Sequence, residues 1–218
     1  MGYLEHLLHF AMPLVVAAGV TIEVSVGAFA LATTLGLLLA SIRFFMPSRL
    51  IRIPISIYVE VFRNVPSLTH LFIIFFGLAY IGIRLDSLVA AIVGLGLIGA
   101  AVLTEIFRAG FEAVHVGQRE AALAVGMTPG MTFREIILPQ TWRVTLPPIG
   151  NYAVQLVKDT SLVAAIAAPE IMFTARNLVV NTFQTTLVYG IAAALYLAIC
   201  IPLSRAIRRL ERRMAIPR

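Results

Sequence analysis

The sequence contains one cysteine and one lysine among its 218 residues. The lone cysteine, Cys200, can complete neither an internal disulfide nor a cysteine-based zinc site. The lone lysine, Lys158, stands between Val157 and Asp159, so the chain has no G-x-x-x-x-G-K-S/T phosphate loop. These absences exclude a disulfide-stabilised fold and a P-loop ATPase.

Charged residues are also scarce. They make up 13% of the chain, whereas hydrophobic residues make up 60%. A soluble domain is typically about half apolar and about a quarter charged, so this composition predicts an integral membrane protein. No stretch alternates apolar and polar residues with a period of two, which argues against a β-barrel. No internal repeat is visible, which argues against an inverted-repeat secondary transporter without excluding it.

The sequence is instead rich in long apolar segments. A membrane-spanning helix needs about 20 residues. Five segments approach or exceed this length, at about residues 14–42, 65–83, 87–107, 144–168 and 185–204. We therefore expect an all-α integral membrane protein of about five transmembrane helices, forming a single permease-like domain over residues 1–218.

The arginines predict the orientation of these segments. If the N-terminus lies outside and five spans alternate, the inside loops and the C-terminal tail hold thirteen arginines, and the outside loops hold Arg84 and Arg176. Cytoplasmic loops carry the excess of basic residues, so we expect the N-terminus outside and the C-terminus in the cytoplasm. The polar segment 118–140 then lies on the cytoplasmic side.

Several polar residues interrupt the segment 144–168. A charge inside a bilayer is costly unless it is paired or faces water or protein. Spacings of i, i+4, i+7 and i+8 put part of the group on one helical stripe. We interpret the region as lining a water-filled path; the alternative is a structural ion pair that anchors this span. The residues are Asn151, Gln155, Lys158, Asp159, Thr160 and Ser161.

Four further charged residues lie inside or next to the expected spans. Glu105 can pair with Arg108 at i+3 or take part in the path, and the sequence leaves both open. Arg63 and Glu60 share one helix face, which predicts an ion pair near the cytoplasmic mouth of the path. Glu23 needs a cation that the sequence does not identify. The histidines are scattered, and we expect neither a metal site nor a catalytic group.

The segment EAALAVGMTPGMTFREIILPQ is too polar and too broken to span a bilayer. Residues 118–125 favour helix, and Gly126 is a natural helix stop. The Thr-Pro-Gly sequence at 128–130 predicts a turn. A second helix is expected to begin at about 131 and to end before Pro139.

One face of the first short helix is nearly flat, because Ala121 and Ala122 carry the smallest side chains. Small side chains let two surfaces approach closely, so this helix can dock into a groove of a partner. An ordinary loop helix lying on the membrane surface is the alternative.

This segment resembles the EAA loop of ATP-binding-cassette (ABC) importer permeases. Glu120, Ala121, Ala122 and Gly126 match it, as does the later I-x-L-P at 136–139. Three further blocks resemble the polar amino-acid uptake branch of that family, and together the matches cover roughly residues 58–170. These blocks are VEVFRNVPSL at 59–68, TEIFRAGF at 104–111 and KDTSL at 158–162.

The resemblance implies a type I importer permease, whose EAA loop forms a coupling helix seated in a cleft of a separate ATPase. ATP and magnesium would then bind that ATPase, and this chain would be neither an enzyme nor a binder of nucleic acid. Further implied partners are a second permease subunit, the same or homologous, and a periplasmic or extracellular amino-acid-binding protein. The implied location is the bacterial inner membrane.

Two motifs depart from the branch. Its Arg-Gly-Thr-Pro motif and following Gln are replaced by Arg-Asn-Val-Pro at 63–66 and by His70. An Ala-Tyr pair is replaced by Ala101 and Val102, so the aromatic side chain of the branch, a candidate substrate contact, is absent. A secondary transporter or channel for a small polar solute, without an ATPase, is the alternative function, and a non-transporting membrane scaffold is a third.

Overall fold

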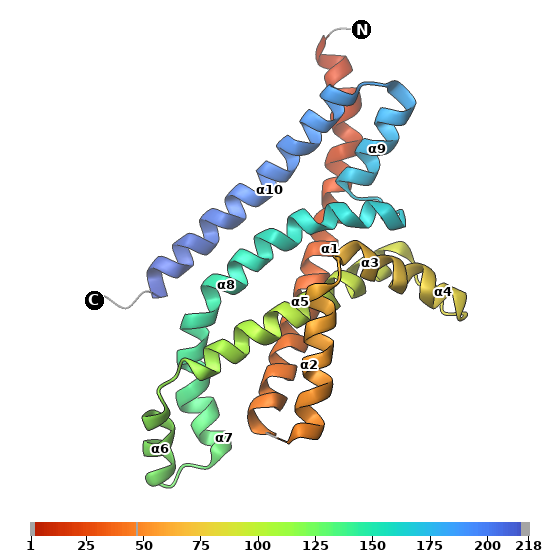
Figure 1. Ribbon diagram of the computed structural model, residues 1–218. Coiled ribbons are helices and arrows are strands. Elements are labelled where there is room, and N and C mark those ends of the chain that lie inside the picture. Colours follow the sequence, from red (N-terminus) through yellow and green to blue (C-terminus); the bar gives the residue numbers. More distant parts are fainter. Residues whose placement is uncertain (1–2, 47, 215–218) are drawn as a thin grey trace.

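The computed structural model describes residues 3–46 and 48–214. Every regular element in these residues is helical, which confirms the predicted all-α class. Figure 1 shows the helices in an elongated arrangement, with the N-terminus at one end and α6 and α7 at the other. In chain order they are α1 (Tyr3–Phe45), α2 (Arg49–Asn64), α3 (Ser67–Phe72), a π-helical turn (Ile73–Gly77), α4 (Leu78–Tyr80), α5 (Ser87–Glu112), α6 (Val116–Ala124), α7 (Pro129–Met131), a second π-helical turn (Thr132–Ile137), α8 (Leu138–Asp159), a 3-10 helix (Thr160–Ile166), α9 (Ile171–Thr182) and α10 (Thr185–Met214).

Three single helices among the described residues are long and apolar enough to cross a membrane: Leu8–Phe45, Ser87–Glu112 and Thr185–Arg213. Two bent helix pairs bring the number of candidate spans to five. The expected segments 14–42, 87–107 and 185–204 fall inside α1, α5 and α10.

The second expected segment, 65–83, begins at a bend and contains only the short helical run Ser67–Tyr80, so the candidate span starts earlier than expected, at Arg49. The chain bends by 110° between α2 and α3, and the candidate span is Arg49–Asn64 joined to Ser67–Tyr80. Val65 and Pro66 are extended at the bend, with ψ of 138° and 136°. Proline disfavours the helical conformation of the preceding residue, which explains why the helix ends here.

The fourth expected segment, 144–168, belongs to a much longer helical run. The run extends over Pro129–Ile166 and bends by 49° into Ile171–Thr182. Its last part is the 3-10 helix, and Ala167 follows in the left-handed conformation with φ of 60°. The polar KDTS sequence therefore lies where the α-helix tightens, just before the bend.

Helix α5 lies between α1 and α8 and packs closely against both. A Cβ atom at Gly99 would overlap Ala32 on α1 and Tyr152 on α8, and one at Gly110 would overlap the methyl group of Thr145. Small residues allow this close approach of helix backbones in a membrane. The result is a tight α1–α5–α8 layer that carries α6 and α7 at one end.

Candidate functional site

Helix α6 contains the proposed docking residues and is closed at both ends by local hydrogen bonds. At its start, Nδ1 of His115 accepts from the backbone N–H of Gly117 at 3.1 Å. At its end, Gly126 has φ of +85°, and its N–H donates to the Leu123 carbonyl at 3.0 Å. Met127 N–H donates to the Ala122 carbonyl at 3.0 Å, which completes a Schellman motif. The predicted helix stop at Gly126 is confirmed.

The two alanines of the EAA sequence do not share an environment. Ala121 is exposed, as are Glu120 and Gly126, whereas Ala122 is only 6% exposed and faces the protein. Val125 nearby is 79% exposed. The surface available for docking is therefore small and apolar, with the carboxylate of Glu120 beside it.

The predicted turn at 128–130 is instead the start of a helix. Thr128 caps it, because its Oγ1 accepts from the N–H of Met131 at 3.3 Å. Pro129 occupies the first helical position, where the missing N–H removes no intrahelical bond. The Thr-Pro-Gly sequence is compatible with either structure, and the capping bond favours the helix.

The helix also fails to end before Pro139, contrary to the sequence prediction. In an ordinary α-helix the proline ring clashes with the carbonyl four residues earlier. Here the preceding turn is π-helical, and Leu138 N–H donates to the Phe133 carbonyl, five residues back. The Gln140 side chain donates to the Ile136 carbonyl at 2.9 Å. The wider turn accommodates Pro139, so one helical run continues into α8.

Aromatic rings join this loop to the spans. Phe44 from the end of α1, Phe111 from α5 and Phe133 from the π-helical turn form a cluster, with centroid separations of 5.2–5.5 Å. The guanidinium carbon of Arg119 on α6 lies 5.4 Å from the centroid of the Phe44 ring. Helix α6 is thus in contact with the end of α1 as well as with its own flanking segments.

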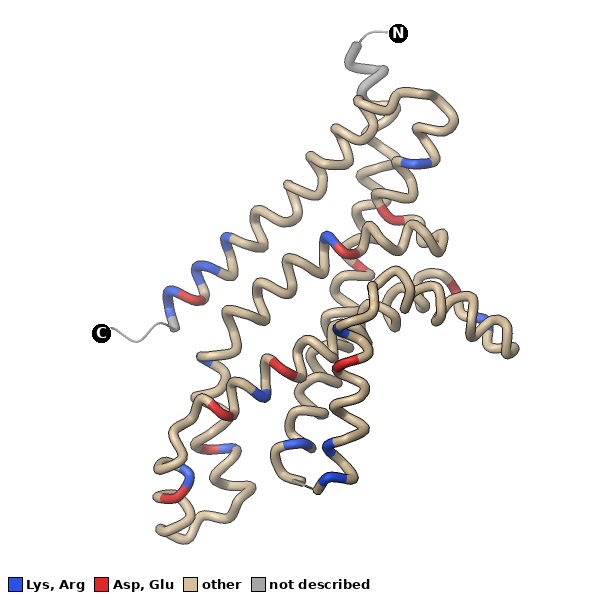
Figure 2. Tube along the Cα trace, viewed as in Figure 1, with Lys and Arg blue, Asp and Glu red and all other residues tan. Residues whose placement is uncertain are grey.

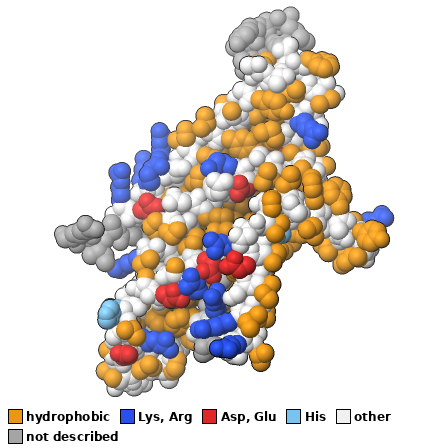
Figure 3. Space-filling view, viewed as in Figure 1, with side chains coloured by type: hydrophobic (Ala, Val, Ile, Leu, Met, Phe, Trp, Pro, Cys, Tyr) orange, Lys and Arg blue, Asp and Glu red, His pale blue; other side chains and the backbone are white. Residues whose placement is uncertain are grey.

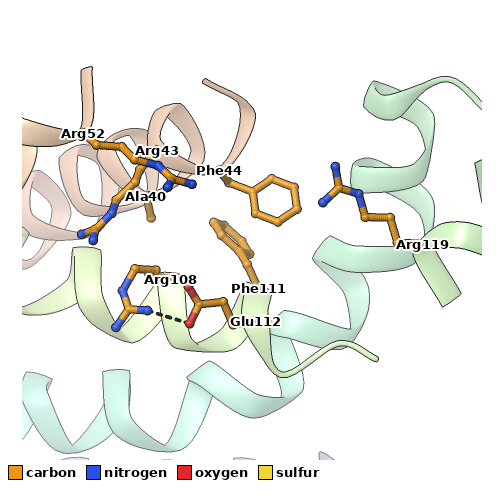
Figure 4. A pocket seen from close by; sticks show the side chains of 8 residues that line it. All are labelled: Ala40, Arg43, Phe44, Arg52, Arg108, Phe111, Glu112 and Arg119. Atoms are coloured by element: carbon orange, nitrogen blue, oxygen red, sulfur yellow. Dashed lines mark hydrogen bonds and ion pairs between the residues drawn. The ribbon is translucent and has the colours of Figure 1, made fainter. Parts of the chain in front are cut away.

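Glu105 pairs with Arg108 at 2.8 Å, which is one of the two alternatives that the sequence left open, and also with Arg43 of α1 at 3.0 Å. Arg108 further pairs with Glu112 at 2.6 Å, as Figure 4 shows. The four side chains connect α1 to α5 near the α6 end of the molecule. The i+3 spacing indicated one of these pairs, whereas the 62-residue separation of Arg43 and Glu105 hid the other.

The predicted Arg63–Glu60 ion pair does not form. The Glu60 carboxylate instead accepts a hydrogen bond from the Asn64 amide at 2.8 Å, since Asn64 lies one turn further along the same face. Arg63 is exposed on α2. Glu23 is exposed on α1, and no ion pair to it occurs among the described residues.

The polar residues near the end of α8 are only partly brought together. The Gln155 amide donates to Oδ1 of Asp159 at 2.8 Å. Asn151, Gln155 and Lys158 are exposed, and within the described residues Lys158 has no carboxylate within 4.0 Å. A cavity of about 210 Å³ opens between α8 and α10; it is lined by Asn151, Val154, Lys158, Ser204, Ile207 and Arg208.

The two hydroxyl residues that follow have local roles. Thr160 is fully buried and donates to the Val157 carbonyl at 2.7 Å. Ser161 donates to the Lys158 carbonyl at 2.8 Å. Both bonds satisfy the end of α8 at the change to the 3-10 helix, and the side chains of Asn151, Gln155 and Lys158 are the most exposed polar groups of this region.

Of the positions that depart from the polar amino-acid branch, His70 lies inside the fold, Val65 and Val102 are half-buried, and Asn64 is exposed. His70 on α3 is 5% exposed and stacks on Phe62, with ring centroids 4.4 Å apart. Its Nδ1 atom is buried without a hydrogen-bond partner in the described part of the chain. Ala101 on α5 is completely buried.

Sequence reasoning missed Glu170, which is completely buried between the 3-10 helix and α9. Its Oε1 accepts from the N–H of Phe173 at 2.7 Å and caps α9. Its Oε2 accepts from the Tyr196 hydroxyl of α10 at 2.7 Å. A single carboxylate therefore fixes α9 against α10. An isolated Glu before an apolar run was the only signal of this in the sequence.

We expect Glu170→Ala to destabilise the protein by about 2–4 kcal/mol, because a helix cap is lost and a buried hydroxyl is left unpaired. Tyr196→Phe keeps the helix cap but leaves one oxygen of the buried carboxylate unpaired, and should cost about 1–3 kcal/mol. Thermal unfolding of the detergent-solubilised protein measures both effects. Equal stability of the Glu170 variant and the parent would show that the carboxylate does not hold α9.

The sequence of this chain is similar to those of known proteins. The family described as binding-protein-dependent transport system inner membrane component matches residues 32–216. The probable amino-acid ABC transporter permease protein YckA of Bacillus subtilis (strain 168) is 37% identical over 182 residues, which are 84% of this chain and 80% of YckA. The glutamine transport system permease protein GlnP of Escherichia coli (strain K12) is 36% identical over 162 residues, 73% of this chain and 74% of GlnP.

Solved structures share the fold. A crystal structure of an amino acid ABC transporter with histidines matches with a TM-score of 0.88 and 28% identity, over 98% of this chain and 99% of that one. An inward-facing structure of the MetNI methionine ABC transporter matches with a TM-score of 0.74 and 20% identity, over 99% of this chain and 100% of that one. The chain therefore belongs to the family of inner membrane components of binding-protein-dependent transport systems, the permeases of ABC transporters.

Proposed function

We propose that this permease takes up a polar amino acid, using ATP hydrolysed by a separate ATPase that docks on residues 120–126. Two observations on relatives support the substrate class: YckA is named as a probable amino-acid permease and GlnP as a glutamine permease. The substrate is delivered by a binding protein outside the membrane, and a second permease subunit completes the path.

The observation that carries the proposal is the helical run Pro129–Ile166. It begins directly after the α6 loop and contains the KDTS sequence near its other end, so one element joins the docking surface to the polar face. A displacement of α6 by the ATPase is transmitted along this run to Lys158. A secondary transporter or channel has no need for an exposed short helix such as α6, with a small apolar surface, at one end of the molecule.

We further propose that the α6 end faces the cytoplasm and the N-terminus faces outside. Thirteen arginines in the loops and tail assigned to the inside against two outside support this orientation. Figure 2 shows basic residues along the α1–α2 connection, on α6 and along the last turns of α10, away from the N-terminus. Arg218, counted in the tail, lies outside the described residues.

The translocation path is assigned to the polar face of α8. Asn151, Gln155 and Lys158 are exposed in the isolated chain, yet they lie within a candidate span. Lipid is a poor environment for such a face, so water, substrate or a second permease must cover it. Asp159 supports the face through Gln155. Glu105 lies in the half of α5 that leads to α6, whereas Arg63 lies at the end of α2 that is away from the α1–α2 connection.

The test is to purify the tagged chain from membranes of its native host and to reconstitute the resulting complex in liposomes. We expect an ATPase in a fixed ratio to the permease, and uptake of labelled polar amino acids that requires both ATP inside the reconstituted system and the binding protein. Uptake driven by an ion gradient alone, with no accompanying ATPase, would support the secondary transporter and overturn the proposal.

A further inference from the structure

A second cavity, distinct from the α8 path, opens at the α6 end of the molecule. It has a volume of about 280 Å³ and lies between α1, α2, α5 and α6. Figure 4 shows its lining, with aromatic rings in the middle and guanidinium groups around them. The lining residues are Ala40, Arg43, Phe44, Arg52, Arg108, Phe111, Glu112 and Arg119. In Figure 3 basic and acidic side chains gather in a band on this face.

The cavity carries more positive charge than its own carboxylates neutralise. Arg43 and Arg108 are paired with Glu105 and Glu112. Arg52 is exposed and has no carboxylate within 4.0 Å among the described residues. Arg119 lies over the face of the Phe44 ring and forms no ion pair with the described residues, so its N–H edge stays available. Four arginines thus face two carboxylates, which leaves an excess of two positive charges.

This arrangement suits a phosphate group better than other anions. Guanidinium groups bind phosphate oxygens through paired, charge-assisted hydrogen bonds. The ion pairs to Glu105 and Glu112 hold the inner arginines in place, so little side-chain entropy is lost when a ligand binds there. The outer guanidinium groups of Arg52 and Arg119 come from different helices and lie on either side of the Phe44 ring, as Figure 4 shows.

The surroundings are also compatible with a lipid. Helix α2, which supplies Arg52, exposes Leu50, Ile53 and Ile57 at 85%, 54% and 58%. Their spacing of i, i+3 and i+7 makes one apolar stripe, on the side of α2 roughly opposite to Arg52. Lipid against this stripe would set Arg52 at the depth of the head groups, on the side of α2 that is turned toward the cavity.

We propose that the cavity between α1, α2, α5 and α6 binds a phosphate group, carried either by an anionic phospholipid or by a soluble phosphate compound. The bound phosphate bridges Arg52 on α2 and Arg119 on α6, and so holds α6 against α1 and α2. The site does not depend on which solute the permease transports.

The binding test uses the full chain in nanodiscs of phosphatidylcholine, with or without phosphatidylglycerol, and native mass spectrometry of the lipids retained after transfer to detergent. The double variant R52Q/R119Q removes both outer arginines, which form no ion pair and are exposed, so the fold should persist. We expect retention of phosphatidylglycerol to weaken by about tenfold or more, because charge-assisted hydrogen bonds are lost. The matched control R49Q/R209Q removes two exposed arginines outside the cavity and should retain the lipid.

A second arm distinguishes the source of the phosphate. Inorganic pyrophosphate is added to the lipid-depleted protein in detergent, and the change in melting temperature is compared between the parent and R52Q/R119Q. A shift confined to the parent supports a soluble ligand, whereas selective lipid retention without such a shift supports a head group. The proposal is overturned if neither probe prefers the parent, or if the control variant loses binding to the same extent.

Discussion

Replacing Ala121 by arginine is expected to abolish ATP-driven uptake while the chain still inserts into the membrane. Ala121 is exposed on α6, so a long side chain fits there without disturbing the fold. Overpacking a close contact costs about 1–3 kcal/mol, and about 1.4 kcal/mol is tenfold in affinity. The ATPase should therefore bind about ten- to a hundredfold more weakly, as measured by the ATPase retained per permease after purification.

Two further alanines serve as controls for this substitution. Ala113 is also exposed but lies at the end of α5, outside α6, so Ala113→Arg should retain the ATPase. Ala122 is 6% exposed, and Ala122→Arg should lower the stability of the loop itself. A normal ratio of ATPase to permease in the Ala121 variant would contradict docking through α6.

Local signals in the sequence were sufficient for parts of this surface and insufficient for others. The stop at Gly126 was predictable because a glycine with positive φ terminates a helix by its own backbone freedom. The inward orientation of Ala122 was not, since it depends on where α6 lies against the rest of the loop. A run of two alanines carries no pattern that distinguishes their faces.

The effect of the prolines was also predictable only in part. Pro66 ends α2, as the restriction on its preceding residue requires, yet the hydropathy of 65–83 started the expected span at this bend and left α2 out of it. Pro139 does not end its helix, because the π-helical turn before it widens the backbone. Whether a proline breaks a helix depends on the turn it follows, and composition alone does not specify that turn.

Contacts between distant residues account for most of what the sequence did not predict. Arg43 and Glu105 are 62 positions apart, and Glu170 and Tyr196 are 26 apart. Each pair satisfies a charged or polar group at a helix junction, and each requires two helices to be already packed. The polar face of α8 was predictable because its residues recur at helical spacing within one segment.

Replacing Lys158 by methionine is expected to lower uptake by about tenfold or more without lowering stability. Lys158 is exposed, and no ion pair holds it within the described residues. A charge-assisted hydrogen bond, such as one to the carboxylate of an amino acid, contributes about 1.5–3 kcal/mol, and methionine cannot make it. A lone charge in a span is itself costly, so its removal should leave the melting temperature unchanged or raised.

These two readouts distinguish a path residue from a structural anchor. If Lys158 were a structural anchor, Lys158→Met would lower the melting temperature, and any variant that still folds would keep its uptake. This is the opposite pattern. Lys158→Arg keeps the charge at the same position on α8 and should retain more uptake than the methionine variant. Uptake is measured in liposomes with the ATPase present, and unfolding is followed on the same preparations. Normal uptake by Lys158→Met would place the path elsewhere, because no other lysine exists in the chain to replace it.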